Sequence, residues 1–316
     1  MNNPGSPLPL LAIDAGNSRL KFGLFEPGRL SHSNSIWPEC REFLAVHVDD
    51  AIPWETLAEW TVATGRQSAI SGTNPRAVER LLKGWARHGW PAPFVVNDFT
   101  AVPVTMDVDF PEKVGLDRLL AAVAANALRP ADRAAIVIDS GTATTVNYVS
   151  TQGTFCGGAI LPGLEMSAKA LNHYTALLPL LPVYELGGDE PVAPGRNTRE
   201  AIRNGLLWGQ VGAIRELVRQ LCLRRGHDLP FDSSQRPWEY SKDILSKAVD
   251  FVPENKAFQE QLRGVEEKLS RTPWLVLTGG GGPVLSPHFP DVMRLASLGM
   301  HGLVLTAWGA GPRKAS

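Results

Sequence analysis

Two short polar turns, each at the end of an apolar segment, constrain the fold of this 316-residue chain more than any other feature. The first turn follows Leu10–Ile13 and reads Asp14-Ala15-Gly16-Asn17-Ser18-Arg19-Leu20-Lys21, after which apolar residues resume. The second reads Asp139-Ser140-Gly141-Thr142-Ala143-Thr144-Thr145. Each pattern predicts a strand, a tight turn and a second strand. Two such turns indicate two lobes that face one nucleotide.

Composition excludes several classes of protein. With 44% hydrophobic and 20% charged residues the chain can bury a substantial core, and its length allows two domains. The formal net charge of -1 gives no electrostatic basis for binding nucleic acid or an anionic membrane. No run of about 18 apolar residues, the length of a membrane-spanning helix, is present.

The N-terminus and the cysteines indicate a cytoplasmic protein. Residues 1–9 lack a basic segment followed by an apolar core, so we expect a short disordered lead and not a signal peptide. Cys40, Cys156 and Cys222 are far apart and odd in number, which argues against a disulfide framework. Neither the cysteines nor the histidines have the spacing of a zinc site.

The order of the expected elements is similar in two parts of the chain, residues 10–130 and 131–316. In the first part we expect strands at Leu10–Asp14, Leu20–Glu26, Leu30–Ile36, Gln67–Ser71 and Phe94–Val96, and helices at Trp54–Ala63, Pro75–His88 and Gly115–Leu128. In the second we expect strands at Ala134–Asp139, Thr144–Val149, Thr154–Leu161, Trp274–Leu277 and Asp291–Leu295, and helices at Leu164–Asn172, Asn197–Cys222 and Gly302–Gly311. Residues 224–271 are polar and interrupted by prolines, so we expect an irregular insertion with one or two helices, such as Ala257–Leu269. The sequence therefore predicts an α/β fold with a structural duplication.

The first turn carries the groups that hold a metal-bound polyphosphate. A carboxylate such as Asp14 at the end of a buried strand points into the crevice where ligands of α/β folds bind, and it can hold Mg²⁺ directly or through water. Gly16 allows backbone N–H groups to approach phosphate, while Asn17 and Ser18 add side-chain donors. Lys21 adds a point charge for phosphate oxygens. A plain hairpin turn is the alternative, although an inward-facing lysine in an apolar strand needs a partner.

The second turn repeats this chemistry with hydroxyl groups. Asp139 can hold a cation or its bound water, and Gly141 with Thr142 can cradle phosphate. The alternative is a threonine-rich strand edge, which the β-propensity of threonine explains well for Thr144 and Thr145. That alternative explains the Asp-x-Gly-Thr order less well.

The segment Gly115-Leu116-Asp117-Arg118 lies between the two turns. Gly115 precedes an expected helix, so Asp117 and Arg118 fall in its first turn. Asp117 can act as an acid–base carboxylate, and Arg118 can pair with a substrate carboxylate. The alternative is local, with Asp117 as a helix-capping or dipole residue and Arg118 as a surface charge.

Three further segments contain glycines or caps. The glycine pair in Gly157–Gly163 permits the close approach of a ligand or another backbone at the end of a strand. Asn197 or Thr198 is expected to cap the long helix, a role compatible with substrate contact. The glycines of Thr278–Gly282 suit a nucleoside that lies flat against the backbone. No Walker lysine loop and no dinucleotide-binding glycine motif follows any expected strand.

Taken in order, these motifs resemble those of the type III pantothenate kinases, which belong to the acetate and sugar kinase, actin and Hsp70-like ATPase superfamily. The resemblance extends from Leu10 to Ala310, except for residues 224–271. Its specific parts are Asp14–Lys21, Gly115–Arg118, Asp139–Thr145, Gly157–Gly163, Ala176–Pro179, and Asn197–Thr198 with Ala201, Ile202 and Gly205. The resemblance implies two RNase H-like lobes of the actin and sugar kinase type, a nucleotide cleft between them, and a homodimer with substrate sites near its interface.

The resemblance also implies a role for each motif. Asp14, Ala15, Gly16, Asn17, Ser18, Arg19, Leu20 and Lys21 would form the first phosphate loop for ATP and Mg²⁺, and Thr142 would contact ATP. Asp117 would take the proton from the primary hydroxyl of pantothenate, and Gly115, Leu116, Asp117, Arg118 and Thr198 would bind this substrate. Asp139 would bind a monovalent cation, K⁺ or NH₄⁺. The implied reaction gives 4′-phosphopantothenate, the first step of coenzyme A biosynthesis.

The chain departs from the family pattern at three places. Asn147 stands where the family usually has Asp, which predicts a weaker cation or water network. Val108 stands where the family usually has a Tyr that lines the pantothenate pocket. Ser71-Gly72-Thr73-Asn74-Pro75 replaces the usual Ser-Ser-Val-Val-Pro run. The changes at Val108 and at Ser71–Pro75 concern the substrate pocket and the choice of substrate, and they leave the phosphate chemistry intact.

Two other functions stay open on the sequence alone. The chain could be a superfamily kinase or phosphatase that acts on another small hydroxy acid. It could also be a catalytically weak regulatory protein, because some members of this family were first described as accessory transcription factors. The presence of Asp14, Lys21, Asp117 and Asp139 favours an enzyme, and no helix-turn-helix or basic stripe supports direct DNA binding.

Overall fold

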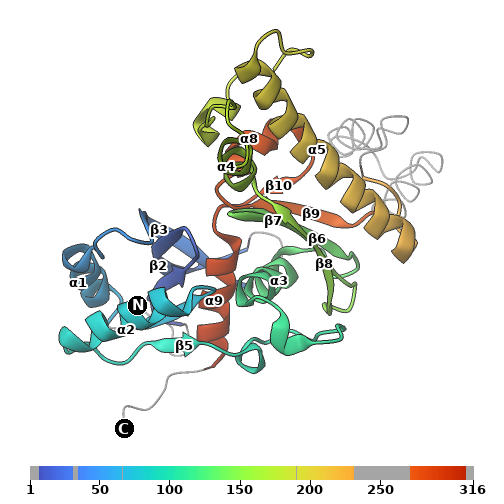
Figure 1. Ribbon diagram of the computed structural model, residues 1–316. Coiled ribbons are helices and arrows are strands. Elements are labelled where there is room, and N and C mark those ends of the chain that lie inside the picture. Colours follow the sequence, from blue (N-terminus) through green and yellow to red (C-terminus); the bar gives the residue numbers. More distant parts are fainter. Residues whose placement is uncertain (1–6, 31–34, 66, 190, 231–270, 311–316) are drawn as a thin grey trace, which may run out of the picture. The chain divides into compact units, whose positions relative to one another are not determined.

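The computed structural model describes residues 7–30, 35–65, 67–189, 191–230 and 271–310 (Figure 1). The chain divides into two compact units. Unit 1 contains Met1–Leu128, Gly153–Gly157 and Leu295–Ser316, and unit 2 contains Arg129–Gln152 and Gly158–Arg294. The first boundary is close to the expected division at residue 130, but the last segment of the chain belongs to unit 1.

Unit 1 contains a mixed five-stranded sheet with the order β3-β2-β1-β4-β5. Its strands are β1 (Leu10–Ala15), β2 (Arg19–Arg29), β3 (Ile36–His47), β4 (Ser68–Gly72) and β5 (Phe94–Val96). β1 is antiparallel to β2 and parallel to β4, while β2 is antiparallel to β3 and β4 is parallel to β5. The central strand β1 therefore ends where the first polar turn begins.

Four helices surround this sheet, namely α1 (Trp54–Ala63), α2 (Pro75–Arg87), α3 (Leu116–Leu128) and α9 (Leu298–Gly309), with two short 3₁₀ turns, η1 (Phe99–Ala101) and η2 (Pro111–Lys113). α2 begins where the sequence indicates, because the Asn74 side chain accepts the Ala77 N–H at 3.2 Å and proline occupies the first helical turn. Its apolar positions Leu81 and Trp85 enter the core with Ile13 and Phe22 of β1 and β2.

The C-terminal helix α9 packs against α3, as Figure 1 shows, and against β1 and β4. Gly302 marks the closest approach of the two helices, since a Cβ atom at this position would lie 1.8 Å from the Leu120 carbonyl oxygen. Only glycine allows this separation. The contact fixes α3, whose first turn carries Asp117.

Unit 2 contains a second five-stranded sheet, with the order β10-β9-β6-β7-β8. Its strands are β6 (Ala135–Ser140), β7 (Ala143–Val149), β8 (Phe155–Pro162), β9 (Trp274–Thr278) and β10 (Met293–Arg294). β6 is antiparallel to β7 and parallel to β9, as β1 is to β2 and β4. Read from β8 to β10, this order equals that of the first sheet, which confirms the structural duplication.

The helices of unit 2 are α4 (Leu164–His173), α5 (Thr198–Arg225) and the short α8 (Gly282–Leu285), with 3₁₀ turns η3 (Val183–Leu186) and η4 (Ser286–His288). The Asn197 side chain caps α5 by accepting the Glu200 N–H at 3.0 Å. Of the two residues expected as the cap, Asn197 and Thr198, it is therefore Asn197 that has this role. α5 ends at Gly226, whose φ of 69° is the left-handed conformation that glycine adopts at a helix end.

One expected strand is wrong. The sequence predicts the third strand at Leu30–Ile36, whereas β2 continues to Arg29 and β3 runs from Ile36 to His47. β3 is an edge strand, where a proline such as Pro38 and several charges are tolerated because one side has no ladder partner. Its sequence therefore lacks the apolar pattern of an inner strand.

The other expected strands and helices of the described ranges are confirmed, with shifted ends. The helix expected at Ala257–Leu269, and most of the insertion expected at 224–271, lie outside the described residues. Within the described part of the chain, no helix combines the length and the apolar character needed to cross a membrane.

Candidate active site

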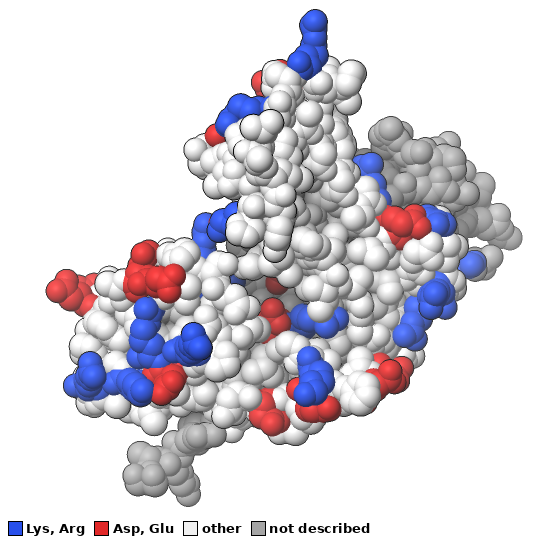
Figure 2. Space-filling view, viewed as in Figure 1, with Lys and Arg blue, Asp and Glu red and all other residues white. Residues whose placement is uncertain are grey.

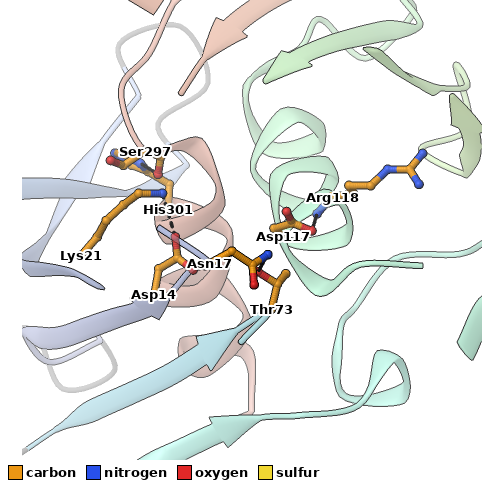
Figure 3. Close-up of polar contacts among 8 residues, drawn as sticks. All are labelled: Asp14, Asn17, Lys21, Thr73, Asp117, Arg118, Ser297 and His301. Atoms are coloured by element: carbon orange, nitrogen blue, oxygen red, sulfur yellow. Dashed lines mark hydrogen bonds and ion pairs between the residues drawn. The ribbon is translucent and has the colours of Figure 1, made fainter. Parts of the chain in front are cut away.

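The first polar turn joins β1 to β2 and places a carboxylate opposite a lysine. Asp14 and Lys21 are register partners across the two strands, and Lys21 Nζ lies 2.9 Å from Asp14 Oδ2 (Figure 3). Their side chains are 22% and 35% exposed, so the pair is accessible to a ligand. The Gly16 N–H closes the turn on the Arg19 carbonyl at 3.0 Å. The partner that Lys21 requires is thus Asp14.

The eight residues of this turn differ in what they can offer a ligand. Ala15 and Leu20 are fully buried in the core, so they position the turn and do not present side chains. Asn17 and Arg19 are exposed, and Ser18 is half-buried. Backbone N–H groups and these polar side chains are what the turn can present to phosphate.

The loop after β4 packs on the first turn. A Cβ atom on Gly72 would lie 2.4 Å from the Ala15 carbonyl oxygen, and the Asn74 N–H donates to the same oxygen at 3.2 Å. The Asn17 side-chain N–H donates to Thr73 Oγ1 at 3.4 Å. The Ser71–Pro75 departure from the family pattern therefore lies beside the first polar turn.

Asp117 stands in the first turn of α3, close to the Asp14–Lys21 pair. It is accessible to solvent, yet surrounding protein atoms restrict its hydration, and this desolvation raises its pKa. The negative charge of Asp14 raises the pKa further, whereas a hydrogen bond from the Arg118 N–H and the charges of Arg118 and Lys21 lower it in part. A carboxyl with a raised pKa is suited to accept a proton.

Local geometry also fixes the Asp117 side chain. Its Oδ1 accepts the Arg118 N–H at 2.9 Å, so the helix-start contact considered from sequence is present alongside the acid–base chemistry. A Cβ atom on Gly115 would lie 2.5 Å from the same oxygen. Gly115 thus leaves the space that the Asp117 carboxyl occupies.

Arg118 follows Asp117 but points elsewhere. In Figure 3 the Asp117 carboxyl lies toward the β1–β2 turn, whereas the Arg118 side chain extends away from it. The Arg118 Cζ lies 5.3 Å from the centroid of the Phe155 ring. Desolvation lowers the pKa of Arg118 and the nearby Asp117 charge partly opposes this effect. The guanidinium is therefore only partly hydrated.

In unit 2, the second polar turn joins β6 to β7 and packs on the segment before α4. Asp139 is the register partner of Thr145, and the Gly141 N–H closes the turn on the Ala143 carbonyl at 3.0 Å. The Gly163 N–H donates to the Thr142 carbonyl at 3.1 Å, and a Cβ atom on Gly163 would lie 2.6 Å from that oxygen. Thr142 itself is exposed.

The glycine run after β9 packs on the same strand end. Gly279 has a φ of 88°, and a Cβ atom there would lie 2.4 Å from Asp139 Oδ1. The Gly281 N–H donates to the Ser140 carbonyl at 2.8 Å. The structure therefore brings together, within unit 2, the Asp139–Thr145 turn, Gly163 and the glycine run.

Asn147 lies beside the expected cation ligand. It is buried, and its side-chain N–H donates to Thr145 Oγ1 at 2.9 Å. Asp139, Thr145 and Asn147 offer carboxylate, hydroxyl and amide oxygens, which are the donors that hard cations prefer. The described ranges contain no group of three or more His, Cys, Asp or Glu side chains that could hold a metal ion.

A hollow of about 450 Å³ in unit 2 was not expected from the sequence. It begins directly after the glycine run, and its walls include Leu186, Leu207, Trp208, Arg215, Pro283 and His288. The Trp208 and His288 rings meet edge to face with centroids 5.0 Å apart. Of its walls, only Pro283 directly follows a motif noted in the sequence, the glycine run that ends at Gly282. The other walls come from α5, η3 and η4, whose proximity the sequence does not reveal.

Thr198, the remaining expected substrate ligand, is the first residue of α5 and is exposed. On the face that Figure 2 shows, basic and acidic side chains are interspersed and do not form one continuous basic surface. This distribution agrees with the small net charge and with a small-molecule ligand.

The chain matches the family model for type III pantothenate kinase over residues 10–220. It belongs to this family. Type III pantothenate kinases from Alkalilimnicola ehrlichii and Rubrobacter xylanophilus are 33% and 36% identical to it over 220 and 225 residues. Each alignment covers 67% of this chain, and they cover 80% and 78% of the two relatives.

A solved structure shows the same fold. A conserved Baf family protein from Campylobacter jejuni, described as a candidate transcriptional activator, superposes with a TM-score of 0.50 and 15% sequence identity. The match covers 95% of this chain and 98% of that chain. This likeness concerns the fold alone.

Membership of the type III pantothenate kinase family makes the chain a phosphotransferase and implies ATP with a divalent metal. The resemblance inferred from the motifs is confirmed. The family match also covers the β1–β2 turn, Asp117, the β6–β7 turn and Thr198, all of which lie within residues 10–220.

Proposed function

We propose that this chain phosphorylates pantothenate with ATP to give 4′-phosphopantothenate, the first step of coenzyme A biosynthesis. The observation that carries the proposal is the position of Asp117, which lies near Asp14 and Lys21 (Figure 3) and whose pKa is raised mainly by desolvation and further by the charge of Asp14. A proton acceptor beside groups suited to Mg²⁺ and phosphate supports phosphoryl transfer to a hydroxyl group. Family membership supplies the substrate.

In the proposed mechanism, Asp117 accepts the proton of the primary hydroxyl as that oxygen bonds to the γ-phosphorus of ATP, while the bond from this phosphorus to the β–γ bridging oxygen breaks and ADP leaves. Lys21 exchanges its contact with Asp14 for a phosphate oxygen and stabilises the charge that develops there. Asp14 is then available to Mg²⁺, which would neutralise phosphate charge. Its accessible carboxylate oxygen fits that ion, since Mg²⁺ prefers oxygen ligands.

Binding of pantothenate would rest on the start of α3 and on Thr198. Arg118 offers a guanidinium for the substrate carboxylate. Gly115 and Leu116 would provide backbone and apolar contacts, and the Thr198 hydroxyl a hydrogen bond. Thr142 would contact ATP, whose nucleoside would lie along Thr278–Gly282 and the adjoining hollow.

We also propose that Asp139 holds K⁺ or NH₄⁺. Its carboxylate and the Thr145 hydroxyl lie on paired strands. Asn147 contributes a neutral amide where a second carboxylate is usual in the family, so a weaker cation interaction is expected.

The decisive experiment measures product directly. Purified protein is incubated with ATP, Mg²⁺ and pantothenate in K⁺ or Na⁺, and 4′-phosphopantothenate is quantified by mass spectrometry. We expect ATP-dependent product that increases with K⁺. No product at millimolar pantothenate would overturn the function. Product from another hydroxy acid in a panel, in its place, would favour the alternative kinase, and no turnover with any acid would favour a regulatory protein.

Gly115→Ala is expected to separate activity from stability. The added methyl group would displace the Asp117 carboxyl, and a misplacement of this kind costs about 10²-fold in rate. The displaced atom ends a flexible side chain, so the melting temperature should change little. Gly209→Ala, in α5 with open space around the added methyl group, is the matched control. Full activity of Gly115→Ala would contradict the placement of Asp117.

We propose that the chain forms a homodimer through an apolar surface of unit 2. Tyr174, Leu177, Tyr184 and Val192 are 80–90% exposed, and they follow α4 within 19 residues of sequence. Several large apolar side chains left exposed within one stretch of sequence are a feature of interface segments.

Leu177→Asp is expected to convert the dimer to a monomer, because a charge would be buried in the interface. Light scattering coupled to size-exclusion chromatography measures the mass. Val62→Asp, at an exposed apolar position on α1 in unit 1, should leave the dimer intact. A monomeric parent protein would refute the proposal.

A further inference from the structure

The Arg118 guanidinium lies over an aromatic ring. Its Cζ is 5.3 Å from the centroid of Phe155, within the distance of about 6 Å at which a cation is attracted to the face of a ring. Arg118 is half-buried, and a cation–π contact strengthens as the cation loses water. The Phe155 ring thus contacts Arg118, although none of the sequence motifs includes Phe155.

Phe155 is held firmly. Its side chain is fully buried at the start of β8. Its N–H donates to the Thr105 carbonyl at 2.8 Å, and its carbonyl accepts the Asp107 N–H at 2.9 Å. Met106 forms a parallel bridge with Phe155. The hydrogen bonds fix the backbone of Phe155, and the tight burial of its side chain limits movement of the ring.

The segment that carries the ring is also tied to the helix that carries the arginine. The Asn126 side-chain N–H, on α3, donates to the Gly153 carbonyl at 2.7 Å. Gly153–Gly157 belongs to unit 1, although the residues on either side of it belong to unit 2. Helix α3, the 105–107 loop and the Phe155 ring thus form one frame around Arg118.

We propose that Phe155 is a positioning residue that aims the Arg118 guanidinium at the carboxylate of the substrate. This inference rests on the proposed function, in which Arg118 pairs with that carboxylate. A guanidinium held against a ring loses less conformational freedom when a carboxylate binds, so affinity rises without a new substrate contact.

The frame also implies a class of substrate. Asp117 and Arg118 are neighbours on α3 whose side chains diverge, as Figure 3 shows. With the guanidinium fixed on Phe155, the separation of proton acceptor and carboxylate partner is fixed as well. The site then selects hydroxy acids whose hydroxyl and carboxylate are separated by the distance between the Asp117 carboxyl and the Arg118 guanidinium.

The test is Phe155→Leu, which keeps an apolar side chain and removes the ring face. The KM for pantothenate should rise about 2- to 30-fold, the range that corresponds to the strength of a cation–π contact. The kcat and the KM for ATP should stay close to those of the parent. Phe155→Tyr keeps the ring face and should retain a KM near the parent value.

Two controls separate positioning from folding. Phe25→Leu removes another fully buried ring of unit 1, one that packs on His301, and should leave the KM for pantothenate unchanged. With the alcohol analogue of pantothenate, which lacks the carboxylate, Phe155→Leu should have no effect on KM. An equal KM increase with the acid and the alcohol would overturn the inference.

A spectroscopic measurement keeps the inference independent of turnover. The Arg118 Nε–H resonance, assigned with Arg118→Lys, should be shifted upfield by the ring in the parent protein, and Phe155→Leu should abolish this shift. Parent protein that fails to phosphorylate pantothenate but shows the shift would overturn the proposed function and leave the arginine–ring contact standing. Active parent protein without the shift would overturn the positioning role.

Discussion

Replacing Asp117 by asparagine is expected to lower kcat for pantothenate phosphorylation by about 10²- to 10⁴-fold, the usual contribution of a positioned general base. The amide cannot accept the hydroxyl proton, yet its oxygen can still accept the Arg118 N–H, so the start of α3 should keep its conformation. Steady-state kinetics measures the loss. Calorimetric titration with ATP should show binding close to that of the parent.

The acid limb of the pH profile tests the same residue. Asp117 must be deprotonated to act, and its pKa is raised above the ordinary value by desolvation and by Asp14. The kcat/KM should therefore fall on acidification with an apparent pKa above that of an unperturbed aspartate. A limb at the ordinary value would contradict the environment described for Asp117.

Stability should move in the opposite direction from activity. A carboxyl whose pKa is raised on folding stabilises the fold when it is protonated, below the pKa of the unfolded chain, and this contribution is lost as pH rises through the folded pKa. At neutral pH, Asp117→Asn removes an ionised group from an unfavourable site, so its melting temperature should equal or exceed that of the parent. Asp49→Asn, at a surface carboxyl that is 87% exposed, serves as the control for both measurements. Unchanged turnover in Asp117→Asn would refute the catalytic role.

Lys21→Met should lower kcat/KM for ATP by about 10²- to 10³-fold, the cost of removing one group that stabilises charge in the transition state. The methionine retains the apolar stem within β2 but cannot compensate phosphate charge or the Asp14 carboxylate. Initial-rate measurements with varied MgATP give the effect.

Lys83→Met is the matched control for this lysine. Lys83 lies on α2, is 69% exposed and pairs with Glu79 one helical turn away, so its removal should leave the kinetics unchanged. Equal kinetics for Lys21→Met and Lys83→Met would show that Lys21 does not stabilise phosphate charge.

Local sequence signals determined much of the fold. The strand pairs around Asp14 and Asp139 could be predicted because each has an apolar run, a polar turn and a second apolar run. β3 could not, since an edge strand with Pro38 and several charges does not show the alternation of a half-buried strand. The assignment of the last helix to unit 1 depends on long-range packing, which no local pattern reports.

In the candidate site, too, local features could be predicted from the sequence and long-range contacts could not. The positions of Lys21 within a strand and of Asp117 in the first turn of a helix could be predicted from residue type and spacing. The contact between Arg118 and Phe155 could not, because it requires the 105–107 loop to pair with the start of β8. The hollow beside Trp208 likewise depends on segments that are distant in sequence.

The close contact of Gly302 with Leu120 has a consequence for biosynthesis of the protein. The helix that carries the proposed base is braced by α9, which lies far later in the sequence, so unit 1 cannot complete its packing until α9 has been synthesised. We expect catalytic competence to appear only after α9 has left the ribosome. A product truncated before α9 would then retain the phosphate turn yet lack a placed base, and premature termination would yield no partly active kinase.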